Sequence, residues 1–198
     1  MVKSRTTSVC MRVLGIDPGT RFLGFGLVEV NGRSTKYLGH GVVRTDPTAP
    51  LAERLLQISK ELQQVMNVYA PEAVAVEGVF TNKNARSALV LGHARGVALL
   101  LAAQNGVPVF EYAPARVKKS VGAGGNDGKD AVARMVTRLL ALKSPLERSD
   151  AYDALAVALC HAHSAGSALP VASGRVQKGS AFASRLSVSY VAPAGVGS

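Results

Sequence analysis

Short apolar segments at the start of the chain predict three consecutive strands. The segment 12–17 stops at a proline–glycine pair, and the segment 22–30 ends at Asn31-Gly32, a pair typical of tight hairpin turns. A third extended segment follows at 35–44. We therefore expect three antiparallel strands that are neighbours in one sheet.

The pattern then changes to a helical period. Over residues 51–69, apolar side chains recur every three or four positions, as on the buried face of an amphipathic helix. A second helix is predicted for 85–105, and Gly106 directly after it is typical of a helix end. Two short apolar segments, 73–77 and 107–112, have no amphipathic alternation and are typical of buried strands.

The rest of the folded part is predicted to be helical. A short helix is expected near 115–121 and longer helices at 130–142 and 150–162, with a glycine-rich loop at 122–128. This order of elements predicts an α/β fold, a mixed five-stranded sheet with helices on both faces. In such folds ligands are expected at the strand ends.

One domain accounts for most of the chain. The 198 residues, 47% of them hydrophobic, suit a single core, which we assign to residues 11–163. Residues 1–10 are expected to be a disordered extension. Residues 164–198, rich in Ser, Ala and Gly and without any Asp or Glu, are expected to be a disordered basic tail. No apolar run reaches the roughly 18 residues of a membrane span and no secretory signal is visible, so we expect a cytoplasmic protein with no membrane partner.

The charge balance favours a polyanionic partner. The chain has 23 Lys and Arg against 13 Asp and Glu, a formal net charge of +10. No strongly basic amphipathic helix indicates a membrane surface, so nucleic acid is the expected partner. The two cysteines, Cys10 and Cys160, lack the spacing of a metal site or a disulfide framework and are expected to be free thiols.

Four acidic residues lie where a folded α/β protein has little structural use for a charge. Asp17 ends the first predicted strand and Glu77 ends the fourth. Asp150 and Asp153 are three residues apart on one helix face, where like charges repel. A metal ion would offset that repulsion, and oxygen-only ligands favour Mg²⁺ or Mn²⁺. Two such ions would support hydrolysis of a phosphodiester.

Ordinary structural explanations for these residues stay open at this point. Asp17 could form an Asx-turn with the proline–glycine pair that follows it, and Glu77 could simply reach solvent at a strand end. Ser149 could be the N-cap of the last helix, and Asp150 could then interact favourably with the helix dipole. This explanation leaves Asp153 unexplained.

Four sequence blocks carry a resemblance to a known family. They are RVLGIDPGTRFLGFG at 12–26, AVEGVFTNKNARSALVLGHARGVA at 75–98, PVFEYAPARVKKSVGAGG at 108–125 and DAYDALAVALCHAH at 150–163. In order and spacing they resemble the RuvC-type Holliday junction resolvases of the ribonuclease H-like superfamily. The resemblance gives four residues the places of the family's metal-binding catalytic carboxylates, with two Mg²⁺ ions, or Mn²⁺ in their place: Asp17, Glu77, Asp150 and Asp153. Some family members carry His at the position of Asp150.

The resemblance also implies residues that contact DNA. Phe80, in the loop after Glu77, takes the place of an aromatic residue that stacks on bases at the crossover, although a core phenylalanine closing the strand is the alternative. Lys118 and Lys129 match basic residues needed near the scissile phosphate. Weaker candidates for DNA contacts are Arg86, Arg95 and Lys119.

The resemblance further implies an activity and partners. We expect a homodimer that cuts four-way junctions in recombination and repair by symmetric metal-dependent hydrolysis on two strands of like polarity, leaving 5′-phosphate and 3′-hydroxyl nicks. The family dimerises through the region of the second helix, where Gly92 and Gly96 allow close approach, although packing within one chain would explain them equally. A branch-migration complex of RuvA and RuvB type proteins is an expected further partner.

Three other functions remain to be weighed. A nuclease of the same superfamily that processes RNA would share the first strand, but the Glu77–Phe80 loop and the Asp150–Asp153 block argue against it. A sugar kinase or actin-like ATPase would explain the sequence 17–20 as a phosphate-binding hairpin, but such proteins need a duplicated domain. A noncatalytic module would bind junctions and never cut them.

Overall fold

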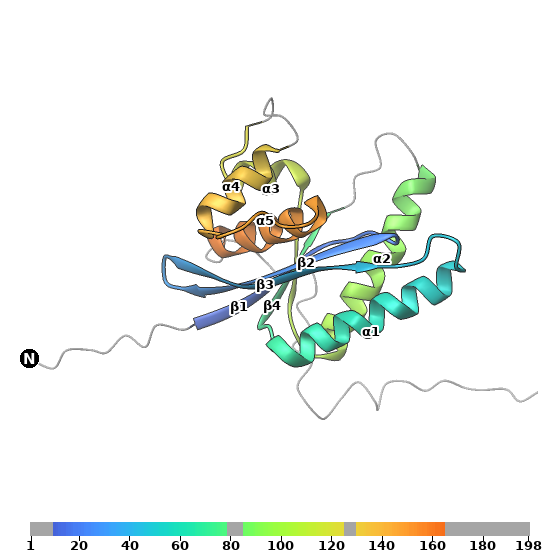
Figure 1. Cartoon of the computed structure of the whole chain (residues 1–198). Helices are drawn as coiled ribbons and strands as arrows, with labels where there is room; N and C mark the ends of the chain where they lie inside the picture. The colour runs from blue at the N-terminus through green and yellow to red at the C-terminus, as the bar shows by residue number, and fades with distance from the viewer. Residues whose placement is uncertain (1–9, 79–84, 125–129, 165–198) are drawn as a thin grey trace, which may run out of the picture.

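A computed structural model of the chain describes residues 10–78, 85–124 and 130–164 (Figure 1). The predictions for 1–10 and 164–198 therefore lie outside the described residues except at their inner ends. There, Cys10 is the first residue of the first strand and Ser164 the last residue of the final helix. Both cysteines are free, as expected.

The elements follow the predicted order. They are β1 (Cys10–Asp17), β2 (Phe22–Asn31), β3 (Ser34–Arg44), α1 (Leu51–Tyr69), β4 (Ala73–Glu77), α2 (Ala85–Gln104), β5 (Val109–Tyr112), α3 (Pro114–Ser120), α4 (Ala131–Leu139) and α5 (Ser149–Ser164). The clearest difference from the prediction is that α4 ends at Leu139 rather than at 142. The chain turns there through Ala141, whose φ is +48°, while apolar Leu140 and Leu142 still pack on the core and continue the helical pattern in the sequence.

The five strands form one mixed sheet in the order β3-β2-β1-β4-β5, which confirms the predicted fold class. β1 pairs antiparallel with β2, and β2 with β3. β4 lies parallel to β1 on one side and to β5 on the other. In the described part of the chain, no helix is long and apolar enough to cross a membrane.

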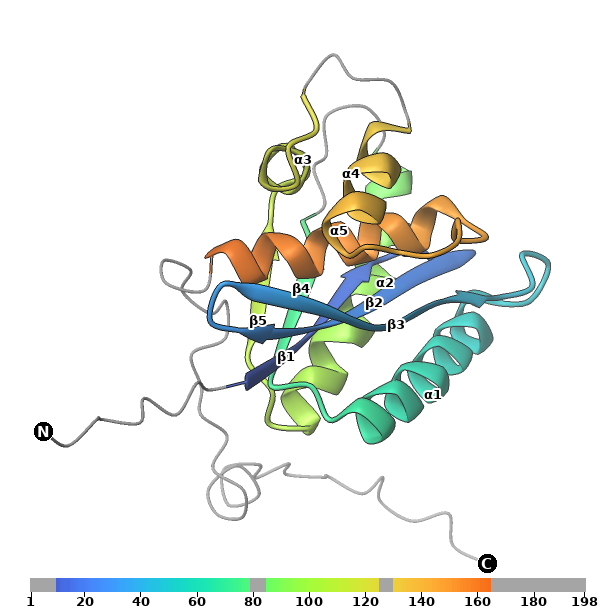
Figure 2. The ribbon, with the colours of Figure 1, turned by 60° about the vertical axis from the view of Figure 1, so that its left-hand side comes forward.

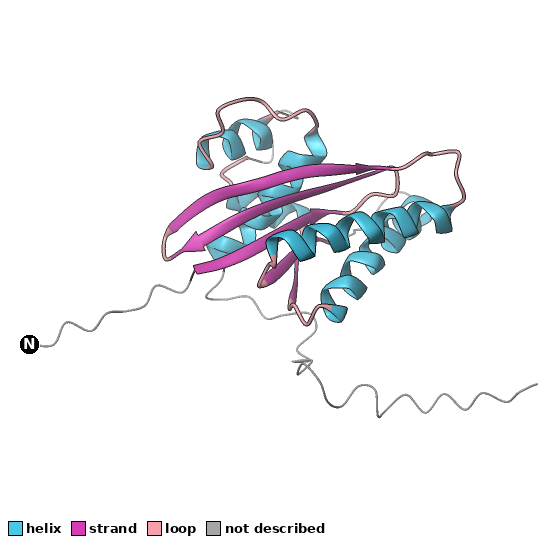
Figure 3. Cartoon of the chain, turned by 60° about the horizontal axis from the view of Figure 1, so that its bottom comes forward, coloured by secondary structure: helices cyan, strands magenta, loops and turns pink. Residues whose placement is uncertain are grey.

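Helices cover both faces of the sheet (Figures 1 and 3). α5 lies across one face with α3 and α4 packed beyond it, whereas α1 and α2 lie on the other (Figure 2). Successive residues of a strand point to opposite faces, so Val13 joins the core under α5 while Leu14 joins the core under α1 and α2. This alternation lets one short strand serve two cores.

Glycines in β1 and β2 let α5 lie directly on the backbone of the sheet. A Cβ at Gly15 would lie 2.1 Å from the carbonyl oxygen of Ala154, and one at Gly24 would lie 2.0 Å from that of Asp150. Gly24 is also the partner of Asp17 in the β1–β2 register. Because no side chain separates helix from sheet there, the first turn of α5 comes close to the end of β1.

Candidate active site

Asp17 and Glu77 are neighbours because they end adjacent parallel strands. The register pairs Ile16 of β1 with Val76 of β4, so the next residue on each strand is a carboxylate at the same edge of the sheet. The carboxyl groups of Asp17 and Glu77 share a hydrogen bond, which contributes to raising the pKa of Asp17 and to lowering that of Glu77. The two side chains therefore lie together, as the strand-end argument predicts.

The loop that follows Asp17 is fixed by hydrogen bonds. Arg54 of α1 donates from Nη2 to Thr20 Oγ1 at 2.9 Å and from Nε to the Thr20 carbonyl at 3.1 Å. Thr45 donates to the same carbonyl, and both threonines are buried. A Cβ at Gly19 would lie 2.0 Å from the Phe22 carbonyl oxygen, so this turn requires glycine.

Asp150 and Asp153 add two further carboxylates from the first turns of α5. Burial, followed by the charges of Glu77, Asp153 and Asp150, raises the pKa of Asp17 to about 8. Burial and then the charge of Asp153 raise the pKa of Glu77, and burial and then the charge of Asp150 raise the pKa of Asp153. The four carboxylates are thus close enough to repel one another.

Lys118 lies on the exposed side of α3. Its positive charge offsets part of the rise in the pKa of Glu77 and of Asp153. Lys119 is the next residue and is also exposed, and both line a shallow pocket with Pro114 and Gly124. Lys118 thus lies near the carboxylates, and Lys119 is its exposed neighbour on α3.

Of the other predicted DNA contacts, only the side chain of Arg95 is described. Phe80 and Lys129 lie outside the described residues, and Arg86 is in α2 but its side chain is not described. Arg95 forms an ion pair with Glu111 of β5, which ties α2 to the sheet. The guanidinium of Arg95 is therefore already engaged in holding the fold together.

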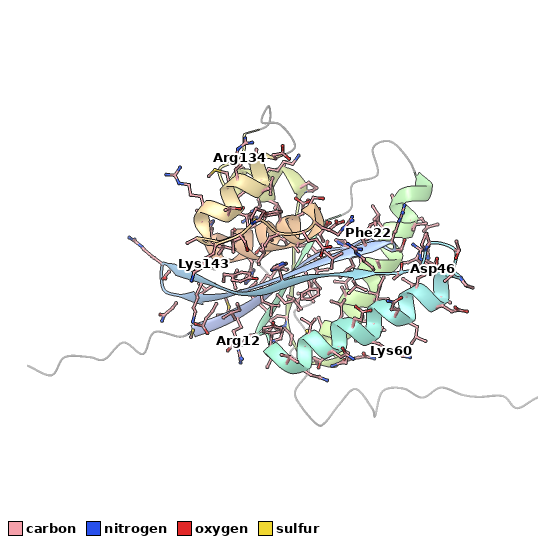
Figure 4. The ribbon with its side chains drawn as sticks, in the orientation of Figure 1. Arg12, Phe22, Asp46, Lys60, Arg134 and Lys143 are labelled. Carbon is pink, nitrogen blue, oxygen red and sulfur yellow. The ribbon has the colours of Figure 1, made fainter. Side chains whose placement is uncertain are left out.

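Arg148 is a charged group at this site that the sequence did not single out. Its Nε donates to Asp150 Oδ2 at 3.0 Å, and its guanidinium carbon lies 3.6 Å from the centroid of the Phe22 ring. Phe22 (labelled in Figure 4) is the first residue of β2, close to the last residue of β1, and the Arg21 guanidinium carbon lies 5.3 Å from the centroid of the same ring. Among 23 basic residues, the only signal for Arg148 was its place just before Ser149 and Asp150.

The chemistry of these side chains suits a hard divalent cation. Clustered carboxylate oxygens that repel one another are stabilised by a metal ion, and they are the ligands that Mg²⁺ and Mn²⁺ prefer. Within the described ranges, no group of three or more His, Cys, Asp or Glu side chains is positioned to hold a metal ion as the side chains lie. The hydrogen bond between Asp17 and Glu77 would have to open for a metal to bind both, and at Asp150 a metal would have to replace Arg148 or share the carboxylate with it.

Comparison with known proteins assigns the family. The family model described as crossover junction endodeoxyribonuclease RuvC matches residues 13–161, most of the chain. The chain belongs to the RuvC family. Crossover junction endodeoxyribonuclease RuvC from Myxococcus xanthus is 61% identical over 188 residues, covering 92% of this chain and 98% of that protein. The RuvC family is one of metal-dependent nucleases.

Solved RuvC structures share the fold. A Thermus thermophilus RuvC structure matches with a TM-score of 0.73 and 40% identity over 81% of this chain and all of that one. The structure described as T. thermophilus RuvC in complex with Holliday junction substrate matches with a TM-score of 0.76 and 41% identity, over 81% of this chain and 99% of that one. The five-stranded sheet with its helices is thus the ribonuclease H-like fold of RuvC, as expected. A sugar kinase or ATPase does not fit a RuvC match of this extent.

The raised pKa of Asp17 predicts an unusual pH dependence of stability. A carboxyl whose pKa rises from 3.8 to about 8 on folding stabilises the fold below pH 3.8, and that contribution is lost as the pH rises towards 8. In chelator, Tm should therefore fall between pH 5 and pH 8.5. Thermal unfolding checks this, and Asp17→Asn should show a shallower slope while keeping the contributions of Glu77 and Asp153. Equal slopes for the two proteins would contradict the assignment.

Proposed function

We propose that this protein is a structure-selective endonuclease that resolves Holliday junctions by metal-dependent phosphodiester hydrolysis. The observation that carries the proposal is the convergence of Asp17 and Glu77, from adjacent strand ends, with the carboxylates of α5 in a chain of the RuvC family. The chain aligns with 99% of a RuvC described as bound to a Holliday junction substrate, which supports the same substrate here.

Four carboxylates would hold the metal, namely Asp17, Glu77, Asp150 and Asp153. Two ions, Mg²⁺ or Mn²⁺, suit this oxygen-only set and supply the Lewis acidity that phosphodiester hydrolysis needs at neutral pH. The protein's own part is to hold these oxygens on rigid elements, namely two strand ends and one helix. Little conformational entropy is then lost when the carboxylates bind a metal. The expected products are 5′-phosphate and 3′-hydroxyl ends.

Basic residues near the carboxylates would position the DNA strand. Lys118 faces the site from α3 and could stabilise charge on the reacting phosphate, with Lys119 contacting backbone beside it. Phe80, Arg86 and Lys129 remain proposed contacts on the family resemblance alone. Stacking by Phe80 would explain a preference for an open crossover over a continuous duplex.

A homodimer would give the two active sites that symmetric cutting requires. Part of α2 is exposed and apolar, with Leu89 at 67% and Leu100 at 58% exposure. Nothing in the described part of the chain lies within 4 Å of a Cβ added at Gly92 or Gly96, so packing against that part does not require glycine at these positions. We propose that α2 meets its copy in a two-fold dimer. Sedimentation should give the mass of two chains, and a monomer at assay concentrations would exclude this dimer.

Cellular context follows from the family alone. We propose that the enzyme acts in the cytoplasm, in recombination and DNA repair, together with a branch-migration complex of RuvA and RuvB type proteins.

A substrate comparison tests the proposed function. With Mg²⁺ or Mn²⁺, the protein should cleave a mobile four-way junction at least about tenfold faster than a linear duplex of the same sequence or a structured RNA, because only the junction presents its crossover strands to both sites. Rates measured with labelled substrates in parallel decide this. Faster cleavage of RNA would favour the RNA-processing alternative, and binding without cleavage would favour a noncatalytic module.

A further inference from the structure

Arg148 and Asp150 form an ion pair at the carboxylates that is better sheltered from water than the neighbouring pair on the surface. The side chains of Arg148 and Asp150 are 29% and 20% exposed, while those of the adjacent pair, Arg44 and Glu147, are 57% and 86% exposed. Nε of Arg148 lies 3.0 Å from Oδ2 of Asp150. Shelter from water strengthens such a pair relative to one on the open surface.

Phe22 holds the guanidinium of Arg148 in that position. The guanidinium carbon lies 3.6 Å from the ring centroid, within the range of a cation–π contact. A stacked guanidinium has little rotational freedom left to lose when it donates to a carboxylate. The Arg148 side chain is therefore fixed by Phe22 on β2 as well as by Asp150 on α5.

The four carboxylates are neutralised in different ways in this arrangement. Asp17 and Glu77 share a hydrogen bond, and Lys118 lies near Glu77 and Asp153. Asp150 has a full positive charge in hydrogen-bonding contact. A divalent cation that takes Asp150 as a ligand has to replace that guanidinium or share the carboxylate with it.

We propose that Arg148 competes with the divalent cation for Asp150 and so sets the metal concentration at which the active site fills. The inference rests on the proposed function, since it takes Asp150 to be a metal ligand. Two physical effects act in the same direction. Arg148 occupies Oδ2, and its positive charge also repels an incoming cation.

Metal binding to the full chain tests this inference without a cleavage assay. Titration calorimetry with Mn²⁺ alone should give a Kd about fivefold lower for Arg148→Gln than for wild type, the scale of a partly buried ion pair. Arg148→Lys keeps the charge but loses the planar stacking on Phe22, so its Kd should lie between those of Arg148→Gln and wild type. Arg44→Gln removes the same charge from the neighbouring pair outside the carboxylate cluster, and it should leave the Kd unchanged.

A double variant shows whether Arg148 acts through Asp150. In an Asp150→Asn background, Arg148→Gln should no longer change the Mn²⁺ Kd, because the contested carboxylate is gone. An unchanged Kd for Arg148→Gln alone would overturn the inference, and so would weaker binding, which would mean that Arg148 orients Asp150 for the metal. Failure of wild-type protein to bind Mn²⁺ would instead contradict the proposed function itself. Thermal unfolding of each variant verifies that it is folded.

Discussion

Asp17→Asn should abolish junction cleavage while leaving junction binding intact. Asn keeps the shape of the side chain but removes a charge that we assign to metal binding. Loss of a direct ligand should cost more than the 10- to 100-fold typical of outer-shell partners, so we expect a fall of about a thousandfold or more. Binding should change little, because it depends on basic residues and phosphate. Single-turnover cleavage and gel-shift titration of one labelled junction measure both effects.

A second aspartate provides the matched control for this variant. Asp46 lies on the surface after β3, where Oδ1 accepts bonds from the backbone and hydroxyl of Thr48 at 2.8 and 2.7 Å. Asn can accept the same bonds, so Asp46→Asn should cleave at the wild-type rate. Full activity in Asp17→Asn would remove Asp17 from the active site. Equal loss in both variants would indicate a general effect of charge or stability.

Gly15→Ala should destabilise the fold and disable the active site together. The added Cβ would lie 2.1 Å from the Ala154 carbonyl oxygen and 2.6 Å from the Ala158 nitrogen, and both are backbone atoms that no rotamer change can move. Overpacking typically costs about 1–3 kcal/mol, and we expect the upper end or more. For a chain of this size, that loss lowers Tm by roughly 6–12 °C. Because α5 carries Asp150 and Asp153, cleavage should fall even where the protein stays folded.

Gly32→Ala separates this clash from the general cost of replacing glycine. Gly32 has a φ of +61°, and a Cβ there would meet nothing within 4 Å among the described residues. An alanine in that backbone conformation costs about 1–2 kcal/mol, so Tm should fall by only a few degrees and activity should persist. A Tm for Gly15→Ala within 2 °C of wild type, as measured by thermal unfolding, would contradict the close packing of α5 on β1.

Local sequence signals were sufficient for most of the fold. The Asn31-Gly32 turn, with Gly32 at positive φ, joins β2 to β3 as predicted, and the three-four periodicity over 51–69 matches α1 at both ends. The strand-end carboxylates followed from topology, since adjacent parallel strands bring their carboxyl ends to one edge. The end of α4 was wrong because Leu140 and Leu142 pack on the core from a turn, and pattern alone does not distinguish that turn from a helix.

Contacts between distant segments could not be read from patterns. The approach of α5 to Asp17 depends on glycines of β1 and β2 meeting a backbone more than a hundred residues away, which no local period encodes. The ion pair of Arg95 on α2 with Glu111 on β5 is one such contact that no local pattern indicated. Arg148 lies at the active site because the fold brings Phe22 of β2 and Asp150 of α5 into contact with its guanidinium.

Strand-resolved mapping of cuts on a four-way junction tests the central claim most directly. Each of the four strands carries its own label, and the protein is incubated with Mg²⁺, with Mn²⁺ or with chelator. The proposed enzyme makes paired cuts at symmetric positions on two strands of like polarity, only when metal is present, and DNA ligase reseals the nicks. Cuts that persist in chelator, unpaired cuts on a single strand, or no cuts under any condition would contradict a metal-dependent junction resolvase.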